Sequence, residues 1–375
     1  MSLRTTPPYR AEHVGSLLRP KRLLAARAEH QAGTLTAEQL RSEEDDAIRD
    51  AIALQQDVGL ESITDGELRR GSWHMDFVYE IGGVERTQTN LLSRFHNDEG
   101  DIEFTPSKAE VRDKLTLDHT IFGDAFEFLA ANTTQGTPKL TIPSPSMVHY
   151  RGGRAAIHAT VYPEMDAFWA DLAAVYANEI RRLADIGCTY LQLDDTCFAY
   201  LNDPTERAAF DARGESGADQ HLTYIRTFNE AVKDRPSEIT VGTHMCRGNF
   251  RSSWVAQGGY DFVAEAVLGT LAVDAFFMEY DDERSGGFEP LRFVPKGKLI
   301  VLGLLTSKKP ALETKDGLKR RIEDAARYID VDQLCLSPQC GFSSTYEGNS
   351  LTMDEQRAKL ALVVETAAEV WGGGD

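Results

Sequence analysis

A histidine and a cysteine stand two positions apart in the segment Thr243-His244-Met245-Cys246. Residues i and i+2 of an extended segment share one face, so both side chains can point to the same place. An imidazole nitrogen and a thiolate together are donors that suit zinc. The pair alone is weak evidence, because cysteine is among the most often buried residues and a core histidine beside a buried cysteine is the commoner arrangement.

Two further donor side chains follow other apolar runs. Glu279 comes directly after Phe276-Phe277-Met278, and Cys340 is followed by Gly341. If these runs are parallel strands, their carboxyl ends meet at one edge, where barrel enzymes place their chemistry. We therefore predict a zinc site, and its four ligands are His244, Cys246, Glu279 and Cys340. A solvated glutamate beside two inert thiols is the competing interpretation, and spacing alone does not exclude it.

The predicted donor set indicates what the metal would do. Zinc with two thiolates and a carboxylate is a poor generator of hydroxide, which suits neutral ligand sets such as three histidines. A thiol that binds a metal loses its proton, whereas a free thiol with a pKa of about 8.5 is mostly protonated at neutral pH. The set therefore favours activation of a substrate thiol for alkylation.

The elements that must position these residues are short apolar strands alternating with amphipathic helices. Eight candidate strands lie near residues 11–15, 61–65, 138–142, 189–194, 238–243, 274–279, 298–304 and 333–337. Helical periodicity is found over residues 36–58, 166–187, 218–232, 314–328 and 353–371. Repeated strand–helix units imply parallel strands, and eight of them predict an α/β fold, a TIM (β/α)8 barrel. We expect one catalytic barrel domain over residues 1–375, with a β-hairpin insertion at 82–120.

Acidic residues follow two other predicted strands. Asp65 and Glu67 come after the second, and Asp194 and Asp195 come after the fourth. For Asp65 and Asp195 we favour capping of local backbone. Glu67 and Asp194 could instead hold a substrate ammonium group. The segment 13–16, which ends at Ser16, could supply backbone donors to a carboxylate.

Composition narrows the partners and the compartment. The formal net charge is −19, and no basic stripe appears, so we expect neither nucleic acid nor a membrane as a partner. The five cysteines are an odd number at irregular spacing, which favours reduced thiols in the cytoplasm over a disulfide framework. The N-terminal stretch has no apolar core of a signal peptide. The expected partners are a small-molecule thiol and a methyl donor.

Five segments in this order resemble a known family: HVGSLLRP, TDGELRRGSW, LQLDDT, THMC and SPQCG. They are similar to the catalytic domain of cobalamin-independent methionine synthase, and more closely to its short, single-domain relatives. The resemblance implies a TIM barrel that uses zinc to transfer a methyl group to homocysteine in methionine biosynthesis. It implies the same four zinc ligands. Its amino-acid contacts match Ser16, Glu67 and Asp194.

Two departures from that family concern the methyl donor. The full-length enzyme has an N-terminal barrel, which we expect this chain to lack. It also carries a histidine in an Asp-x-His-Ser-Pro stretch after the seventh strand, thought to protonate the departing donor. This sequence has Thr306-Ser307-Lys308-Lys309-Pro310 there, which puts Lys308 at the place of the histidine. We therefore expect Asp194 and Lys308 as catalytic residues and leave the donor open.

Homocysteine methylation is the leading hypothesis, and three others were weighed. Zinc-dependent alkylation of another thiol, such as coenzyme M, keeps the metal and changes the acceptor. A decarboxylase of the uroporphyrinogen type shares the barrel but has no reason to keep four convergent metal donors. A structural zinc protein would favour cysteine and histidine ligands in closely spaced pairs over a glutamate ligand.

Overall fold

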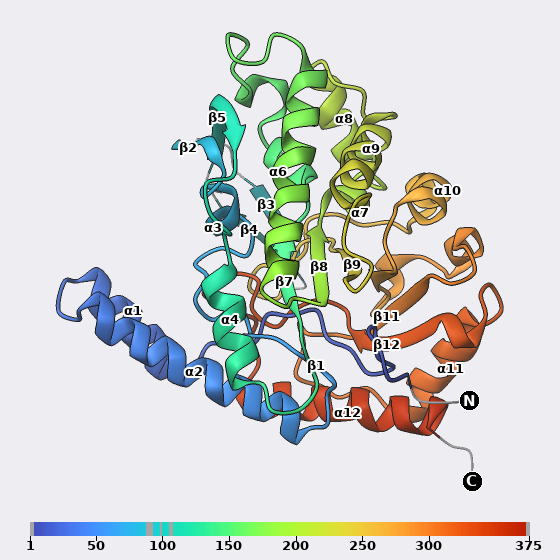
Figure 1. The fold of residues 1–375 in the computed structure, drawn as a ribbon. Coiled ribbons are helices and arrows are strands. Elements are labelled where there is room, and N and C mark those ends of the chain that lie inside the picture. Colours follow the sequence, from blue (N-terminus) through green and yellow to red (C-terminus); the bar gives the residue numbers. More distant parts are fainter. Residues whose placement is uncertain (1–3, 88–92, 98–99, 105–107, 373–375) are drawn as a thin grey trace.

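Strands and helices alternate along most of the chain (Figure 1). The computed structural model describes residues 4–87, 93–97, 100–104 and 108–372. Within these residues, no helix combines the length and apolar character needed to cross a membrane.

Six parallel strands form the main sheet, in the order β12-β11-β10-β9-β8-β7. Their bounds are β7 (Leu140–Pro143), β8 (Tyr190–Asp195), β9 (Thr240–Met245), β10 (Ala275–Glu279), β11 (Leu299–Leu305) and β12 (Leu334–Pro338). Nearly every residue of these strands is buried. Parallel strands covered on both faces need continuous apolar sequence, which is why the runs could be recognised.

The parallel arrangement continues beyond both edge strands. On one side β1 (Ser62–Ile63) pairs with β6 (Thr137–Pro138), which leads directly into β7. On the other side, Ala11 forms a parallel bridge with Leu336 of β12. These pairings give eight parallel positions in chain order, as in a (β/α)8 barrel.

The first of these positions is shorter than the predicted strand at 11–15, which shrinks to the bridge at Ala11. Side chains from neighbouring positions bind the next carbonyl oxygens in place of a ladder. The Lys139 ammonium donates to the His13 carbonyl, and the Gln192 amide donates to the Val14 carbonyl at 2.7 Å. An apolar pattern does not reveal such competition for backbone groups.

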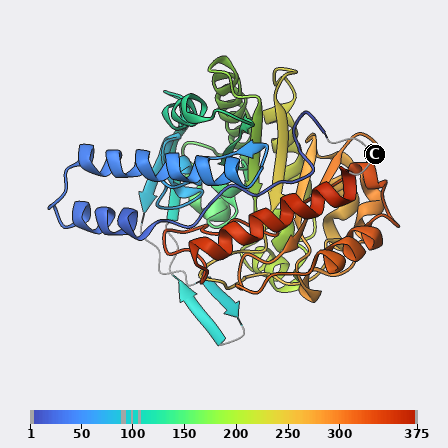
Figure 2. The same ribbon diagram turned by 90° about the horizontal axis from the view of Figure 1, so that it is seen from below.

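The helices cover the strands. They are α1 (Lys21–Gln31), α2 (Ala37–Asp57), α3 (Met75–Val78), α4 (Gly123–Asn132), α5 (Ser146–His149), α6 (Met165–Asp185), α7 (Cys197–Tyr200), α8 (Pro204–Ala212), α9 (Gln220–Val232), α10 (Asp261–Thr270), α11 (Lys315–Ala325) and α12 (Met353–Trp371). Thr36 and Thr352 begin α2 and α12 with capping boxes. The α1–α2 pair projects from one side, and α12 crosses one end of the molecule (Figures 1 and 2).

Two antiparallel strand pairs lie between α3 and α4, in the stretch 82–120. Strand β2 (Gly82–Thr87) pairs with β5 (Lys108–Thr116), and β3 (Ser93–Asn97) pairs with β4 (Gly100–Phe104). The backbone of His96 in β3 exchanges hydrogen bonds of 2.7 and 2.9 Å with Trp254, in the loop after β9. This contact joins the insertion to a loop at the carboxyl end of the sheet.

Candidate metal centre and substrate cavity

Four buried donor side chains meet at the carboxyl end of the parallel strands. His244 lies in β9 and Cys246 follows it, Glu279 ends β10, and Cys340 comes two residues after β12. One ligand atom from each lies within 4.8 Å of the others. The parallel register explains the convergence, because His244 pairs with Phe277, two residues before Glu279. The structure thus brings together all four predicted ligands.

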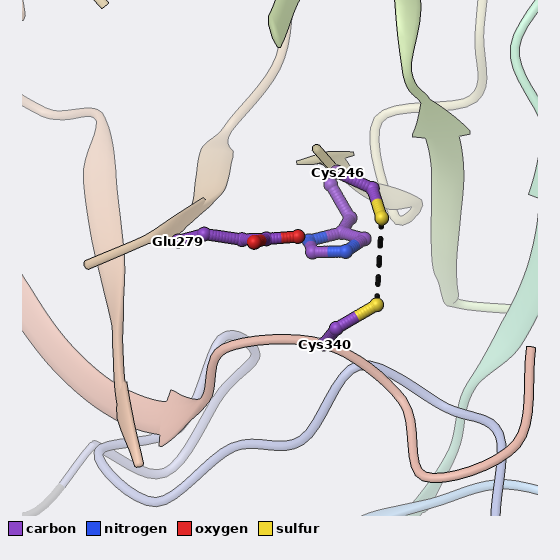
Figure 3. A group of neighbouring side chains, drawn as sticks. Cys246, Glu279 and Cys340 are labelled. Carbon is purple, nitrogen blue, oxygen red and sulfur yellow. Dashed lines mark hydrogen bonds between the residues drawn. The ribbon is translucent and has the colours of Figure 1, made fainter. Parts of the chain in front are cut away.

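The two sulfur atoms face each other at the centre of this group. Cys246 Sγ lies 3.5 Å from Cys340 Sγ, and the Glu279 carboxylate points toward the same space (Figure 3). His244 is 2% exposed, and neither of its ring nitrogens has a hydrogen-bond partner among the described residues. A buried polar group without a partner costs free energy, so these nitrogens are suited to a ligand.

Protons balance the charge of this cluster in the metal-free protein. The shared hydrogen bond with Cys246 lowers the pKa of Cys340 well below its usual range, and the same bond raises the pKa of Cys246. Burial alone would lower the pKa of His244, but nearby Cys340 and the carboxylates raise it to about 9. Burial raises the pKa of Glu279. The cluster then has a thiolate at Cys340 and protons on Cys246 and His244, which a bound cation could displace.

Backbone amides and the Lys308 ammonium surround the cluster. The Arg247 amide donates to Glu279 Oε1 at 3.0 Å, and the Gly248 amide donates to Cys246 Sγ at 3.3 Å. Lys308 Nζ lies 3.9 Å from Glu279 Oε2 and 4.0 Å from Asp281 Oδ2. Partners of this kind fix the orientation of metal ligands.

A cavity of about 310 Å³ opens onto the cluster, and Cys246, His244 and Cys340 form part of its wall. The same wall contains the three predicted amino-acid contacts, which are Ser16, Glu67 and Asp194. Neither Glu279 nor Lys308 is part of this lining.

The two acids in the cavity wall are buried and oriented by hydrogen bonds. Thr141 donates to Glu67 Oε1 at 2.7 Å, and Gln192 donates to Asp194 Oδ1 at 2.7 Å. Burial, together with the charge of Glu67, raises the pKa of Asp194 to about 7, and burial also raises the pKa of Glu67. Glu67 has a φ of 57°, a left-handed conformation that is uncommon outside glycine. Such outliers often mark functional sites.

The other two acids bind their own loops. Asp65 Oδ1 accepts from the Glu67 amide at 2.8 Å. Asp195 accepts from the Phe198 amide at 2.9 Å and from two serine hydroxyls. Asp65 therefore stabilises the turn that contains Glu67, and Asp195 stabilises the backbone that follows β8, next to Asp194.

Lys308 is not part of the lining of the first cavity. It lines a second cavity of about 610 Å³, together with Arg251, Trp254, Arg284 and Lys309. Burial disfavours its charged form, but the carboxylates of Asp281 and Glu279 outweigh burial and raise the pKa of Lys308. Lys308 therefore does not border the cavity that contains the predicted amino-acid contacts, and its role as a proton donor stays a prediction.

Several residues of the first cavity escaped sequence reasoning. Trp73 is the last residue of the recognised segment TDGELRRGSW and His74 directly follows it, but neither was assigned a role. Phe250 follows the cysteine motif closely. Arg151 lies beyond α5, and nothing in its local sequence points to the cavity.

Known proteins were compared with the chain. A family model described as the catalytic domain of cobalamin-independent synthase matches residues 143–369. The chain is 46% identical over 369 residues to the uncharacterized protein YxjH of Bacillus subtilis, covering 97% of this chain and 95% of that protein. It is 25% identical over 330 residues to methionine synthase of Pyrococcus abyssi, covering 88% and 84%.

A solved structure extends this similarity to the fold. The putative vitamin-B12 independent methionine synthase from Listeria monocytogenes aligns with a TM-score of 0.78 at 34% identity, covering 99% of this chain and 100% of that chain. With the family model matching more than half of its length, the chain belongs to the cobalamin-independent methionine synthase family of methyltransferases.

Proposed function

We propose that this enzyme methylates the sulfur of homocysteine to give methionine and that zinc is its metal. The observation that carries the proposal is the meeting of four buried donor atoms, three of which belong to residues that line a cavity together with Ser16, Glu67 and Asp194. The metal donors and the amino-acid contacts thus face one small substrate.

The donor set supports zinc. Two sulfurs, one imidazole nitrogen and one carboxylate oxygen are ligands that tetrahedral zinc accepts, and soft thiolates disfavour magnesium or calcium. The unpartnered nitrogens of His244 fit a metal bond. Zinc bound there would keep a substrate thiol in its thiolate form at neutral pH.

The cavity acids support an amino-acid substrate. Glu67 Oε1 lies 3.4 Å from the Arg70 guanidinium, whereas Asp194 has no ion-pair partner among the described residues. An ammonium group between the two acids would supply the charge that Asp194 lacks, because a buried charge requires a partner. Ser16 borders Gly341, where an added Cβ would lie 1.9 Å from Ser16 Oγ. This close approach puts Ser16 beside the loop that contains Cys340, which supports Ser16 as the contact of the substrate carboxylate.

The cavity acids also favour homocysteine over other thiol acceptors. A thiol without an amino group, such as coenzyme M, would leave Asp194 without an ion-pair partner, so this alternative is disfavoured. Structural zinc is disfavoured because the cluster opens onto a cavity. Family membership argues against a decarboxylase of the uroporphyrinogen type.

The proposal is tested by metal analysis and product formation together. Protein purified without added metal should hold about one zinc per chain, and it should form methionine from homocysteine with at least one of methyltetrahydrofolate, its polyglutamate and methylcobalamin. A Cys246→Ser, Cys340→Ser double variant should lose both. Full zinc content in the double variant would refute the assigned site.

The control is a Cys188→Ser, Cys335→Ser double variant. Both cysteines are buried like the two proposed ligands, but neither belongs to the cluster. This variant should keep its zinc. Parallel loss of zinc from both double variants would indicate damage to the fold.

A further inference from the structure

The first cavity has a second polar end, formed by residues that the proposed reaction has not used. His74 lies just before α3, and Arg151 lies two residues beyond α5. These segments follow β1 and β7, whereas the metal cluster comes from β9, β10 and the loop after β12. His74 and Arg151 line the first cavity together with three of the four metal donors, so the polar end and the cluster border the same space.

His74 is buried at this end without a full set of partners. It is 6% exposed, and its Nε2 has no hydrogen-bond partner among the described residues. Its Nδ1 lies 3.3 Å from the Ser72 hydroxyl, and its ring lies 4.5 Å from that of Trp73. Because both neighbours fix the ring, Nε2 is held in place for a ligand in the cavity.

Arg151 adds a positive charge beside His74. Burial, followed by the charge of Arg151, lowers the pKa of His74 well below its ordinary value, so the imidazole is neutral at pH 7. The Arg151 Nε atom is buried and unpartnered, and the described carboxylates form no ion pair with its guanidinium. Glu206, a carboxylate whose pKa the charge of Arg151 affects, accepts a hydrogen bond from the Tyr150 hydroxyl and forms no ion pair with Arg151, so the guanidinium can bind an anion.

Tyr200 connects this end of the cavity to the metal cluster. It is 5% exposed and belongs to the cavity lining. Its hydroxyl lies close to Gly248, two residues after Cys246, where an added Cβ would be 2.7 Å from Tyr200 Oη. Its ring lies 5.5 Å from that of Tyr150, the residue before Arg151. Tyr200 therefore lies between the segment of Arg151 and the segment of Cys246.

We propose that Arg151 and His74 form an oxyanion subsite that binds a carboxylate, sulfonate or phosphate group of the methyl donor. The inference rests on the proposed function, in which Ser16, Glu67 and Asp194 hold the amino acid. The guanidinium offers forked N–H groups to the oxyanion. An oxyanion selects the tautomer of His74 that carries its proton on Nε2, and the Ser72 hydroxyl can then donate to Nδ1.

The oxyanion of the methyl donor and the carboxylate of the amino acid could both bind such a subsite, so the experiment must distinguish the two. Metal-loaded protein is titrated calorimetrically with methanesulfonate, a weakly metal-binding oxyanion, and with dimethyl sulfone, its uncharged counterpart. Each titration is run without methionine and with saturating methionine, which has the amino-acid group of the proposed substrate.

We expect methanesulfonate to bind and dimethyl sulfone not to bind, with methionine leaving the affinity unchanged. Arg151→Met should weaken methanesulfonate binding about 10-fold or more, the loss expected for a charge-assisted hydrogen bond. Arg151→Lys should retain part of the affinity. His74→Phe, which keeps a ring beside Trp73, should weaken binding severalfold. The control Arg327→Met removes the same charge from an exposed position and should change nothing.

Equal binding by wild type and Arg151→Met, or no binding by wild type, would overturn the subsite. Displacement of methanesulfonate by methionine would overturn its assignment to the donor, since the amino-acid carboxylate would then be the natural occupant. Methionine binding by the Arg151→Met protein verifies the fold. Failure of methionine to bind the wild type and all the variants would instead count against the proposed function.

Discussion

Protonation of single residues sets the conditions for metal binding at the cluster. In the metal-free protein the pKa of Cys340 is lowered, whereas the pKa values of Cys246 and His244 are raised, the latter to about 9. Metal ligands must be deprotonated. A metal ion therefore displaces protons mainly from Cys246 and His244 below pH 9.

The apparent zinc affinity should rise steeply with pH. Two displaced protons give a slope of about two in the logarithm of the association constant against pH between about 6 and 8. The affinity rises with pH because Cys246 and His244 hold their protons below their raised pKa values, and zinc must displace these protons. Competition with a chelator of known affinity at several pH values measures the slope. A slope near zero would contradict the assigned protonation.

Asp194 is the residue whose charge should matter most for acceptor choice. Replacing it by Asn keeps the shape and the contact with Gln192 but removes the charge offered to an ammonium group. Removing one partner of a buried charged pair typically costs about 3–5 kcal/mol. The loss of kcat/KM should therefore be far larger for homocysteine than for 2-mercaptoethanol. Equal losses for the two thiols would mean that Asp194 serves the chemistry or the fold.

Strand ends and the loops after them bring the site together. The four donors and the cavity acids come from five parallel positions, and the loop after β12 packs on the segment that contains Ser16. Most of this placement was predictable, because buried parallel strands are continuous apolar runs and barrel chemistry collects at their carboxyl ends. The shortened first strand was not, since side chains such as Lys139 take its carbonyls.

The loop after β12 has no room for a side chain at Gly341. An alanine Cβ there would lie 1.9 Å from Ser16 Oγ. Gly341→Ala should weaken methionine binding roughly 10-fold while zinc content stays near one, in line with the usual 1–3 kcal/mol cost of overpacking. Gly269→Ala adds the same methyl group at a position where the Phe293 carbonyl oxygen would be 3.9 Å away, and this variant should bind methionine normally. If Gly341→Ala bound methionine as tightly as the wild type, Ser16 would not be a contact of the amino acid.

Across the molecule, local sequence could not reveal which distant segments share the cavity. Arg151 and His74 line one cavity because the positions of β1 and β7 are neighbours through β6. Lys308 could be aligned with a proton-donating residue, but its place beside Glu279 and outside the cavity lining follows from the three-dimensional course of β10 and β11. The metal ligands were predictable because each one lies at or just after the carboxyl end of a recognisable strand.

The environment of Lys308 bears on the choice of methyl donor. A general acid works best with a pKa near the working pH, and the carboxylates around Lys308 raise its pKa instead. Methyltetrahydrofolate needs protonation as its methyl group departs. Turnover with its polyglutamate should therefore be slow, and a methylcorrinoid or another donor with a better leaving group should react faster. Steady-state rates at equal concentrations decide this, and folate turnover equal to or above the others would contradict it.

Proton release on binding of homocysteine tests thiol activation without knowledge of the donor. Calorimetry of the zinc-loaded enzyme at pH 7, in buffers of different ionisation enthalpy, counts the protons released by homocysteine and by methionine. Methionine corrects for Asp194, whose pKa of about 7 falls when an ammonium group binds. The account predicts about one more proton for homocysteine than for methionine, and loss of this difference in the Cys246→Ser, Cys340→Ser variant. Equal release by the two amino acids from the zinc-loaded enzyme would contradict it.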